Sequence, residues 1–385
     1  MKKILLMLVI LPALAGLGWW YFHERTLESL APLYREYAYI TNGKSNSVSV
    51  IDLRTFQKVA TIKVGVGPGG IAANGKRNEV YVVNTGSNNI SIINTERNVV
   101  VATLGVHATP YFIDVSEDGK RAYVANAASN NVSVLDLDRR VLLGNIHVGN
   151  GPGLARVSPD GTTVVVSNRG DDSVTLINAQ NLQVKSTVTV CHQPEDIAIV
   201  PDNSKAFVSC SGSAQVASID LKTGKLLALL DVGKTPVNLA LKPDGGELIV
   251  CNFDSDNISI IETTTNEVAG SYLIGKHPTR GIVSADNSRL YVSNFGSNSV
   301  AVYDIDMGKV IATVPVGSYP DGLALSRSQN YLLALDSQSG DVTVIQKRSP
   351  RKLEPTEYSL LTMIPVGVQP NNVVVKSFML PKAVH

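Results

Sequence analysis

The sequence contains few of the residues that cofactor and metal sites commonly use. It has only three cysteines, Cys191, Cys210 and Cys251, and no Cys-x-x-Cys-His motif, which excludes a covalently attached c-type haem on this chain. No spacing of cysteine and histidine matches a zinc site. No nucleophile elbow or catalytic-triad order is present either. We therefore predict no catalytic residues, and the sequence favours a protein that is not an enzyme.

The chain also lacks a concentrated charge of one sign. Its 385 residues include 34 Lys and Arg against 33 Asp and Glu, a net charge of +1. Outside Lys347-Arg348 and Arg351-Lys352 the basic residues are scattered. General nucleic-acid binding requires a concentrated cationic surface, so we do not expect nucleic acid as a partner.

A fixed step of 42 residues runs through the chain. Starting from Asn42, the step reaches Asn84, Asn126, Asn168, Cys210, Asn252, Asn294 and Asp336. A series of prolines from Pro68 to Pro320 keeps the same step, and Pro370 follows after an eight-residue insertion. Periods near this length are typical of solenoids and propellers. The chain therefore contains eight copies of one structural unit.

Each unit has the pattern of short strands and tight turns, because its apolar residues alternate in runs separated by Gly, Pro, Asn and Asp. In the third unit we predict an inner strand over 154–157, a second over 163–168, a third over 173–178 and an outer one over 184–190. A four-stranded antiparallel sheet repeated radially is the blade of a β-propeller. We predict an all-β, eight-bladed propeller over residues 38–378, closed where the C-terminal inner strand joins the N-terminal blade.

The second strands carry a recurring four-residue motif. It reads Tyr39-Ile40-Thr41-Asn42, Tyr81-Val82-Val83-Asn84, Tyr123-Val124-Ala125-Asn126 and Tyr291-Val292-Ser293-Asn294. A Ser-Asn-x-Val/Ile-Ser-Val/Ile run follows three of these four copies, and Val-Gly-x-x-Pro later follows three of them. These motifs resemble the YVTN-repeat β-propeller family across residues 38–378. The resemblance implies the fold. It does not imply one function, because propellers of this type include surface-layer proteins, ligand or nucleic-acid binders and partners of redox enzymes.

The number of blades is also similar to that of the haem d1 domain of dissimilatory nitrite reductase and its maturation relatives. That second resemblance implies a tetrapyrrole capping a wide channel. It rests on blade number alone, since no stretch of this chain matches the ligand motifs of those proteins. We predict no cofactor, and a tetrapyrrole or a metal remains an alternative.

The amino end has the features of an export signal. Met1-Lys2-Lys3 precedes an apolar run from Ile4 to Phe22. Ala13-Leu14-Ala15 could be a cleavage site, but the aromatic residues 19–22 favour an uncleaved membrane anchor of about the length needed to span. We therefore expect a signal peptide or anchor over 1–22, a linker or stalk over 23–37 and a tail over 379–385. The protein would lie in the periplasm or at the cell surface.

Export permits a disulfide. If Val200 pairs with Ala206, Asp196 lies opposite Cys210, and Cys191 lies in the loop above the same end of the blade. We therefore consider a Cys191–Cys210 bridge. Cys251 points to the opposite face of its blade, where it would be a small buried hydrophobe.

The units differ most around the proline, and in a repeat protein the differences carry the information. The residues after each proline begin the inner strands nearest the central channel. Candidates for ligand or partner binding at this mouth are Tyr111, Arg169, Glu195, Asp196, Asn238, Phe253, Arg280, Phe295, Asp321 and Asn372. Placed polar groups with apolar walls are typical of a binding site. The alternative is a set of solvated loop tips with local ion pairs, such as Asp196 with Arg280.

Two charged residues receive a structural interpretation. Asp114 and Arg156 occupy the same repeat position in adjacent inner strands, where other copies carry alanine. Either charge would be costly if buried alone, so we predict an ion pair between the two blades.

Three histidines, His107, His192 and His277, lie in rim loops of alternate units and complete the list of candidates. Alternate blades of eight are about 90° apart, so we do not expect the three imidazoles to share one metal ion. A single histidine as axial ligand of a planar cofactor is a less demanding arrangement than a metal ion shared by three histidines.

The sequence thus predicts a module that binds a small ligand or a protein partner through its channel-mouth rim. One alternative is a tetrapyrrole- or metal-linked redox accessory protein. The other is a lactonase-like hydrolase, which would need a nucleophile or metal-bound water with a nearby base, and Glu195, Asp196 and His192 are the residues available for it.

Overall fold

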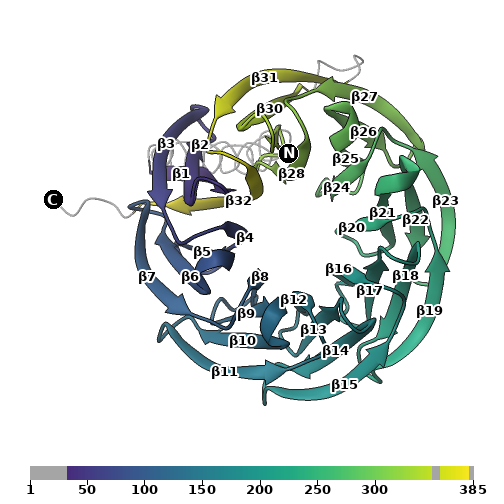
Figure 1. Ribbon diagram of the computed structural model, residues 1–385. Coiled ribbons are helices and arrows are strands. Elements are labelled where there is room, and N and C mark those ends of the chain that lie inside the picture. Colours follow the sequence, from purple (N-terminus) through teal and green to yellow (C-terminus); the bar gives the residue numbers. More distant parts are fainter. Residues whose placement is uncertain (1–32, 349–355, 381–385) are drawn as a thin grey trace, which may run out of the picture.

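The computed structural model describes residues 33–348 and 356–380, which form a closed ring of eight four-stranded antiparallel sheets (Figure 1). The predicted fold and the number of blades are confirmed. The predicted signal peptide or anchor, residues 23–32 of the predicted linker and tail residues 381–385 lie outside the described residues. Within the described part of the chain, no helix is long and apolar enough to cross a membrane.

Each blade contributes one strand to each of four concentric positions. The inner strands are β4 (Pro68–Ala73), β8 (Pro110–Val115), β12 (Pro152–Val157), β16 (Pro194–Ile199), β20 (Pro236–Leu241), β24 (Pro278–Val283), β28 (Pro320–Leu325) and β32 (Pro370–Met379). The second strands are β1 (Tyr34–Asn42), β5 (Glu79–Asn84), β9 (Arg121–Asn126), β13 (Thr163–Asn168), β17 (Lys205–Cys210), β21 (Glu247–Asn252), β25 (Arg289–Asn294) and β29 (Tyr331–Asp336).

The two outer layers follow the same order. The third strands are β2 (Ser47–Asp52), β6 (Asn89–Asn94), β10 (Asn131–Asp136), β14 (Ser173–Asn178), β18 (Gln215–Asp220), β22 (Asn257–Glu262), β26 (Ser299–Asp304) and β30 (Asp341–Arg348). The outer strands are β3 (Gln57–Lys63), β7 (Val99–Gly105), β11 (Val141–His147), β15 (Gln183–Thr189), β19 (Lys225–Asp231), β23 (Glu267–Leu273), β27 (Lys309–Pro315) and β31 (Glu357–Pro365). Short 3-10 turns follow four of the second strands: η1 (Thr85–Ser87), η2 (Ala127–Ser129), η3 (Phe253–Ser255) and η4 (Phe295–Ser297).

The ring closes by pairing β1 with β32, as the strand count predicted. This pairing is longer than expected. β1 begins at Tyr34, inside the segment predicted as a linker, and β32 continues to Met379, where the tail was expected to begin. The reason is that the extra residues have partners: the Tyr37 ring packs edge-on against Phe378, with centroids 5.7 Å apart. The buried Glu36 also accepts a hydrogen bond from the backbone N–H of Arg327 in the neighbouring blade, at 2.6 Å.

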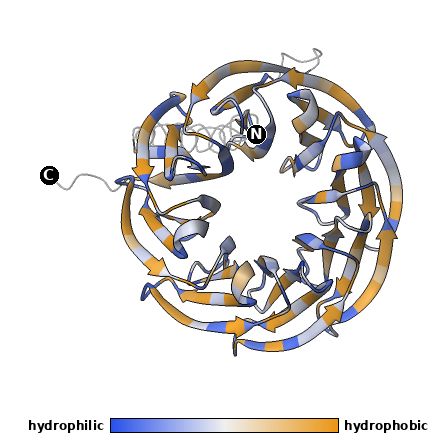
Figure 2. Ribbon diagram, in the orientation of Figure 1, coloured by the Kyte–Doolittle hydropathy of each residue, from blue (hydrophilic) through white to orange (hydrophobic). Residues whose placement is uncertain are grey.

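The hydrophobic core lies between neighbouring blades. Second and third strands such as β5 and β2 are buried along their whole length, whereas outer strands such as β3 are largely exposed. Figure 2 shows apolar residues along the strands of every blade. The motif tyrosines Tyr39, Tyr81, Tyr123 and Tyr291 are among the largest fully buried side chains. Each blade therefore needs both neighbours to cover its apolar faces, which favours a closed ring.

The repeat asparagine ties the end of its second strand to the third strand. In the blade formed by β12, β13, β14 and β15, the Asn168 Nδ2 donates to Ser173 Oγ at 3.0 Å and to Thr175 Oγ1 at 2.9 Å. The glycine of the preceding Val-Gly loop packs directly on this amide, because a Cβ built at Gly149 would lie 2.6 Å from Asn168 Nδ2. The recurring spacing of Gly and Asn in the repeat therefore reflects a packing contact, in which the glycine leaves room for the amide.

In the last blade an aspartate, Asp336, occupies the position of the repeat asparagine. It is fully buried, and its Oδ2 accepts a hydrogen bond from Thr343 Oγ1 at 2.6 Å. Burial, together with the neighbouring carboxyl of Asp341, raises the pKa of Asp336 to about 8. The other oxygen, Oδ1, is buried without a hydrogen-bond partner, which favours the neutral form of the side chain at this position.

We predict that Asp336→Asn stabilises the protein above pH 5. The unfolded carboxyl ionises near its usual pKa of about 4, so folding at higher pH must restore its proton. The stability that Asp336 contributes is full below about pH 4 and is lost as pH rises toward the folded pKa. Thermal unfolding followed by circular dichroism should give the variant a higher unfolding temperature than the wild type at pH 8. The difference between the two temperatures should shrink toward pH 5. Equal unfolding temperatures at both pH values, or the same gain in the exposed control Asp306→Asn, would contradict this account.

Candidate functional site

The variable residues of the repeat gather at one end of the ring. Inner strands begin and second strands end at this mouth. Hydroxyl groups just before the repeat Asn fix the next inner strand: Ser167 Oγ donates to the backbone carbonyl of Glu195 at 2.9 Å, and Ser293 Oγ donates to that of Asp321 at 3.1 Å. The start of each inner strand, where the copies differ, is thus held by its neighbour.

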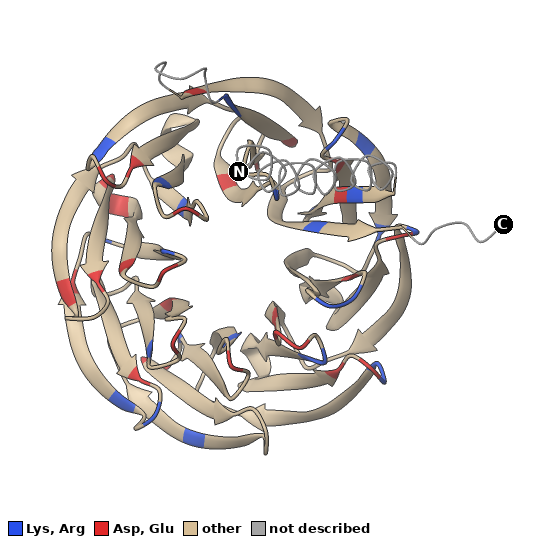
Figure 3. Ribbon diagram, turned by 180° about the vertical axis from the view of Figure 1, so that it is seen from behind, with Lys and Arg blue, Asp and Glu red and all other residues tan. Residues whose placement is uncertain are grey.

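A cavity of about 450 Å³ occupies the channel at this end. Its polar and aromatic lining comprises Lys44, Thr85, Tyr111, Phe112, Arg156, Arg169, Glu195, Asp196, Arg280, Asp321, Gln369, Asn371 and Asn372. Seven of the residues selected from the sequence belong to it: Tyr111, Arg169, Glu195, Asp196, Arg280, Asp321 and Asn372. The other six do not line it: His107, His192, Asn238, Phe253, His277 and Phe295. Figure 3 shows basic and acidic residues interspersed around the ring.

Arg169 and Glu195 form a fixed pair on the cavity wall. Arg169 Nη2 lies 2.6 Å from Glu195 Oε2, and the guanidinium stands 4.8 Å from the centroid of the Tyr111 ring. Ser211 Oγ donates a further hydrogen bond to Glu195 Oε1 at 3.3 Å. Three predicted residues therefore meet, and the carboxylate and the guanidinium largely satisfy each other.

Asp196 and Asn238 connect successive inner strands. Asp196 Oδ2 accepts hydrogen bonds from Asn238 Nδ2 at 2.8 Å and from the Leu239 N–H at 3.0 Å. Asn238 Oδ1 in turn accepts from the Gly281 N–H at 2.7 Å. Both residues are buried. Asn238 is therefore a scaffold residue that joins β16 to β24, whereas Asp196 has this role and also reaches the cavity.

Arg156 belongs to the cavity, although the sequence placed it in a pair with Asp114. Its guanidinium lies 4.4 Å from the centroid of the Phe112 ring, and its ion pair is with Asp196, at 3.9 Å. Asp114 instead accepts a hydrogen bond from the Val157 N–H of the next blade at 3.0 Å. Burial raises the pKa of Asp114 and the nearby charge of Arg156 lowers it. The sequence signal for Arg156 was present, since arginine replaces alanine on a strand that faces the channel.

The side chains of Arg280 and Asp321, like that of Lys44, make no hydrogen bond or ion pair among the described residues of the cavity. The suggested pair of Arg280 with Asp196 does not form, since Asp196 pairs with Arg156. Burial raises the pKa of Asp321, while the charge of Arg280 lowers it. Arg280 and Asp321 therefore interact electrostatically, but they form no ion pair within 4.0 Å among the described residues.

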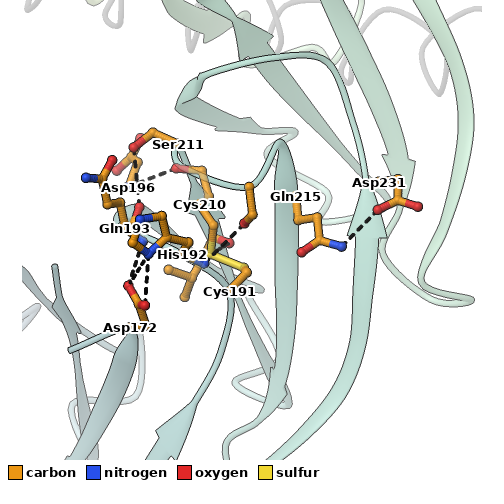
Figure 4. Close-up of a disulfide and its surroundings, with 12 residues drawn as sticks. Asp172, Cys191, His192, Gln193, Asp196, Cys210, Ser211, Gln215 and Asp231 are labelled. Atoms are coloured by element: carbon orange, nitrogen blue, oxygen red, sulfur yellow. Dashed lines mark hydrogen bonds and ion pairs between the residues drawn. A yellow bond between two sulfur atoms is a disulfide. The ribbon is translucent and has the colours of Figure 1, made fainter. Parts of the chain in front are cut away.

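The three histidines have local partners at the rim. His107 places Nδ1 2.7 Å from Asn131 Nδ2 and Nε2 3.0 Å from Asn145 Nδ2. His192 Nδ1 lies 2.9 Å from Asp172 Oδ2 (Figure 4). Over residues 33–348 and 356–380, no group of three or more His, Cys, Asp or Glu side chains is arranged to hold a metal ion.

Aromatic rings form a row along the rim next to β24. His277 stacks on Phe253 with centroids 4.5 Å apart, Phe253 lies 6.2 Å from Phe295, and Phe295 stacks on Tyr319 at 4.5 Å. We refer to these four residues as the aromatic row. Tyr319, at its end, is 41% exposed. Sequence reasoning selected three of the four and missed Tyr319, which lies in the variable Val-Gly-x-x-Pro loop.

A disulfide joins Cys191 and Cys210, with Cα atoms 5.7 Å apart (Figure 4). The strand register behind the prediction was one residue off, since Ile199 pairs with Ala206 and a bulge follows Pro194. The bridge forms because the two cysteines occupy the positions of the contacting Gly and Asn of the repeat. The blade also has Ala217 where Thr175 accepts the Asn168 amide in its neighbour. The disulfide thus replaces the Gly–Asn contact.

Cys251, the third cysteine, is free and buried. Burial raises the pKa of its thiol to about 12. A thiol in this state is a weak nucleophile, which agrees with the role of a small hydrophobe.

We predict that reduction of the disulfide lowers the free energy of unfolding by about 3 kcal/mol. The triple variant Cys191→Gly, Cys210→Asn and Ala217→Ser restores the contact of the other blades, so its stability should not depend on reductant. Urea unfolding with and without dithiothreitol compares the two proteins. An oxidised wild type no more stable than the reduced one would show that the bridge contributes nothing.

Two family models match parts of the sequence. The YNCE-like beta-propeller model matches residues 35–157, and the model of the lactonase 7-bladed beta-propeller matches residues 141–232 and 280–369. No curated protein matches the sequence.

Many solved structures share the fold. Hydrazine synthase of Kuenenia stuttgartiensis has a TM-score of 0.60 and 23% identity, covering 73% of this chain and 95% of that one. A dihydro-heme d1 dehydrogenase, NirN, in complex with DHE has a TM-score of 0.73 and 15% identity, covering 88% and 74%. A functionally unknown protein from Desulfotomaculum acetoxidans has a TM-score of 0.61 and 15% identity, covering 88% and 98%. At these identities the structures show the fold alone. Together with the two family models they agree with the fold that the sequence motifs indicate, and the chain is an eight-bladed β-propeller.

Proposed function

We propose that the protein is an exported or membrane-anchored binding module that takes a small ligand or a protein partner at its channel mouth. The observation that carries this proposal is the cavity, to which variable residues from several blades contribute side chains of different chemistry. The rigid ring holds those side chains in place, so binding requires little ordering of the scaffold.

The partly exposed aromatic row at the same end supports a role in recognition. Aromatic residues are enriched among the residues that contribute most to protein interfaces. The row spans three successive blades through Phe253, Phe295 and Tyr319, and offers a continuous surface beside the loop that leads to Arg280. A ligand in the cavity and a partner on the row could be recognised together.

The two alternatives receive less support from the geometry. The likeness to NirN in complex with DHE favours a tetrapyrrole by fold, but His107, His192 and His277 all have rim partners and none lines the cavity. A lactonase-like reaction needs a base beside the substrate. His192 pairs with Asp172, Glu195 pairs with Arg169, and Asp196 accepts hydrogen bonds from the scaffold. Binding is the function that these contacts favour.

Export is proposed from residues 1–22 and agrees with the disulfide, since such bonds persist outside the cytoplasm. A phosphatase reporter that works only after export, fused behind His385, should be active with the full chain and inactive when residues 2–22 are deleted. Activity that survives the deletion would contradict export by this segment. The intact mass of the purified protein then distinguishes an uncleaved anchor from cleavage after Ala15.

Crosslinking at single positions tests whether the mouth is the binding surface. We expect a photo-crosslinking residue at Tyr319 to form a specific adduct in the native host. The same residue at Met307, 58% exposed on a turn at the opposite rim, should form none. Adducts at both positions, or only at Met307, would show that the mouth is not the recognition surface.

A further inference from the structure

Arg280 is held in the cavity with its hydrogen-bonding capacity unused. Among the described residues its guanidinium makes no hydrogen bond, has no carboxylate within 4.0 Å, and keeps an Nε that is closed to solvent without an acceptor. A guanidinium carries five N–H donors in a planar fork that fits an oxyanion. Partly buried charges normally have a partner, so this residue is set up for a partner that the chain itself does not supply.

The carboxylates of the cavity are committed elsewhere. Glu195 holds Arg169, at 2.6 Å, and receives the hydroxyl of Ser211. Asp196 accepts hydrogen bonds from Ile197, Asn238 and Leu239, and the ion pair that it makes is with Arg156. Asp321 lies beyond 4.0 Å from Arg280, although the two charges interact. Movement of a carboxylate to Arg280 would therefore break contacts that hold the ring, except in the case of Asp321.

The cationic groups of the cavity outnumber its carboxylates. Lys44, Arg156, Arg169 and Arg280 line it together with Glu195, Asp196 and Asp321. Arg156 and Arg169 are fixed over the Phe112 and Tyr111 rings, and the Nε of each also lacks an acceptor. These stacked guanidinium groups are preorganised and lose little freedom when a ligand binds.

We propose that the cavity binds the oxyanion group of a small ligand, a carboxylate or a phosphate, with Arg280 as its main contact. This inference rests on the proposed binding function and names its ligand class. Arg280 donates to the oxyanion through its planar fork, and the stacked side chains of Arg156 and Arg169 form the adjoining wall. The cavity volume of about 450 Å³ limits the ligand to the size of a small metabolite.

Thermal shift and calorimetric titrations with citrate and with inorganic phosphate test the proposal, at constant ionic strength set with sodium chloride. At least one of the two should raise the unfolding temperature of the wild type. Arg280→Gln should weaken that binding by about 10- to 100-fold, as expected when charge-assisted hydrogen bonds are lost. Arg97→Gln, which removes an exposed arginine from a turn outside the cavity, should leave it unchanged. The better of the two anions identifies the carboxylate or the phosphate source.

The stability without ligand separates a binding role from a structural one. Because Arg280 has no close partner, Arg280→Gln without anion should unfold at the same temperature as the wild type or higher. Lower stability together with an unchanged anion response would overturn the proposal, as would the absence of binding by both anions. If neither anion binds while crosslinks still form at Tyr319 and not at Met307, the mouth is a partner surface and only the ligand class is wrong. If both experiments fail, the binding function fails with it.

Discussion

The contact between a glycine and a buried amide determines most of this structure. At the end of most second strands an asparagine such as Asn168 donates to side chains of the third strand, and in most blades the glycine of the preceding loop packs on this residue. This contact fixes the turn between two strands and the loop that leads to the next blade. Where residue types change, the contact takes another form: Cys191–Cys210 substitutes a covalent bond, His107 takes the place of a glycine, and Asp336 accepts from Thr343 in place of the amide.

The same contact explains why the two ends of the ring differ. Loops at the mouth are anchored by the amide, so the residues that follow each proline can vary without loss of the fold. Hydrogen bonds from one blade to the next hold these variable residues in position, through Ser167 to Glu195 and through Asp196 to Leu239. A cavity lined by arginines, carboxylates and aromatic rings is compatible with a regular scaffold for this reason.

The sequence predicted the eight blades because the 42-residue step is a property of the chain alone, and the order of strands follows from it. It also selected seven residues that line the cavity, since the repeat shows which positions begin the inner strands. It did not predict that Arg156 leans over Phe112, that Asn238 joins two blades, or that His107 lies between two asparagines. Those outcomes depend on side-chain directions across blades, which no repeat position encodes. β1 likewise begins early because Tyr37 finds Phe378 at the far end of the chain.

We propose the channel mouth as a binding site in which Arg280 supplies the unused donors. A crystal structure of the protein soaked with the anion that stabilises it would show the contacts of that site. We expect an oxyanion within hydrogen-bond distance of the Arg280 guanidinium, with Glu195 still paired with Arg169. A solvent-filled cavity in which Arg280 has turned to pair with Asp321 would contradict it.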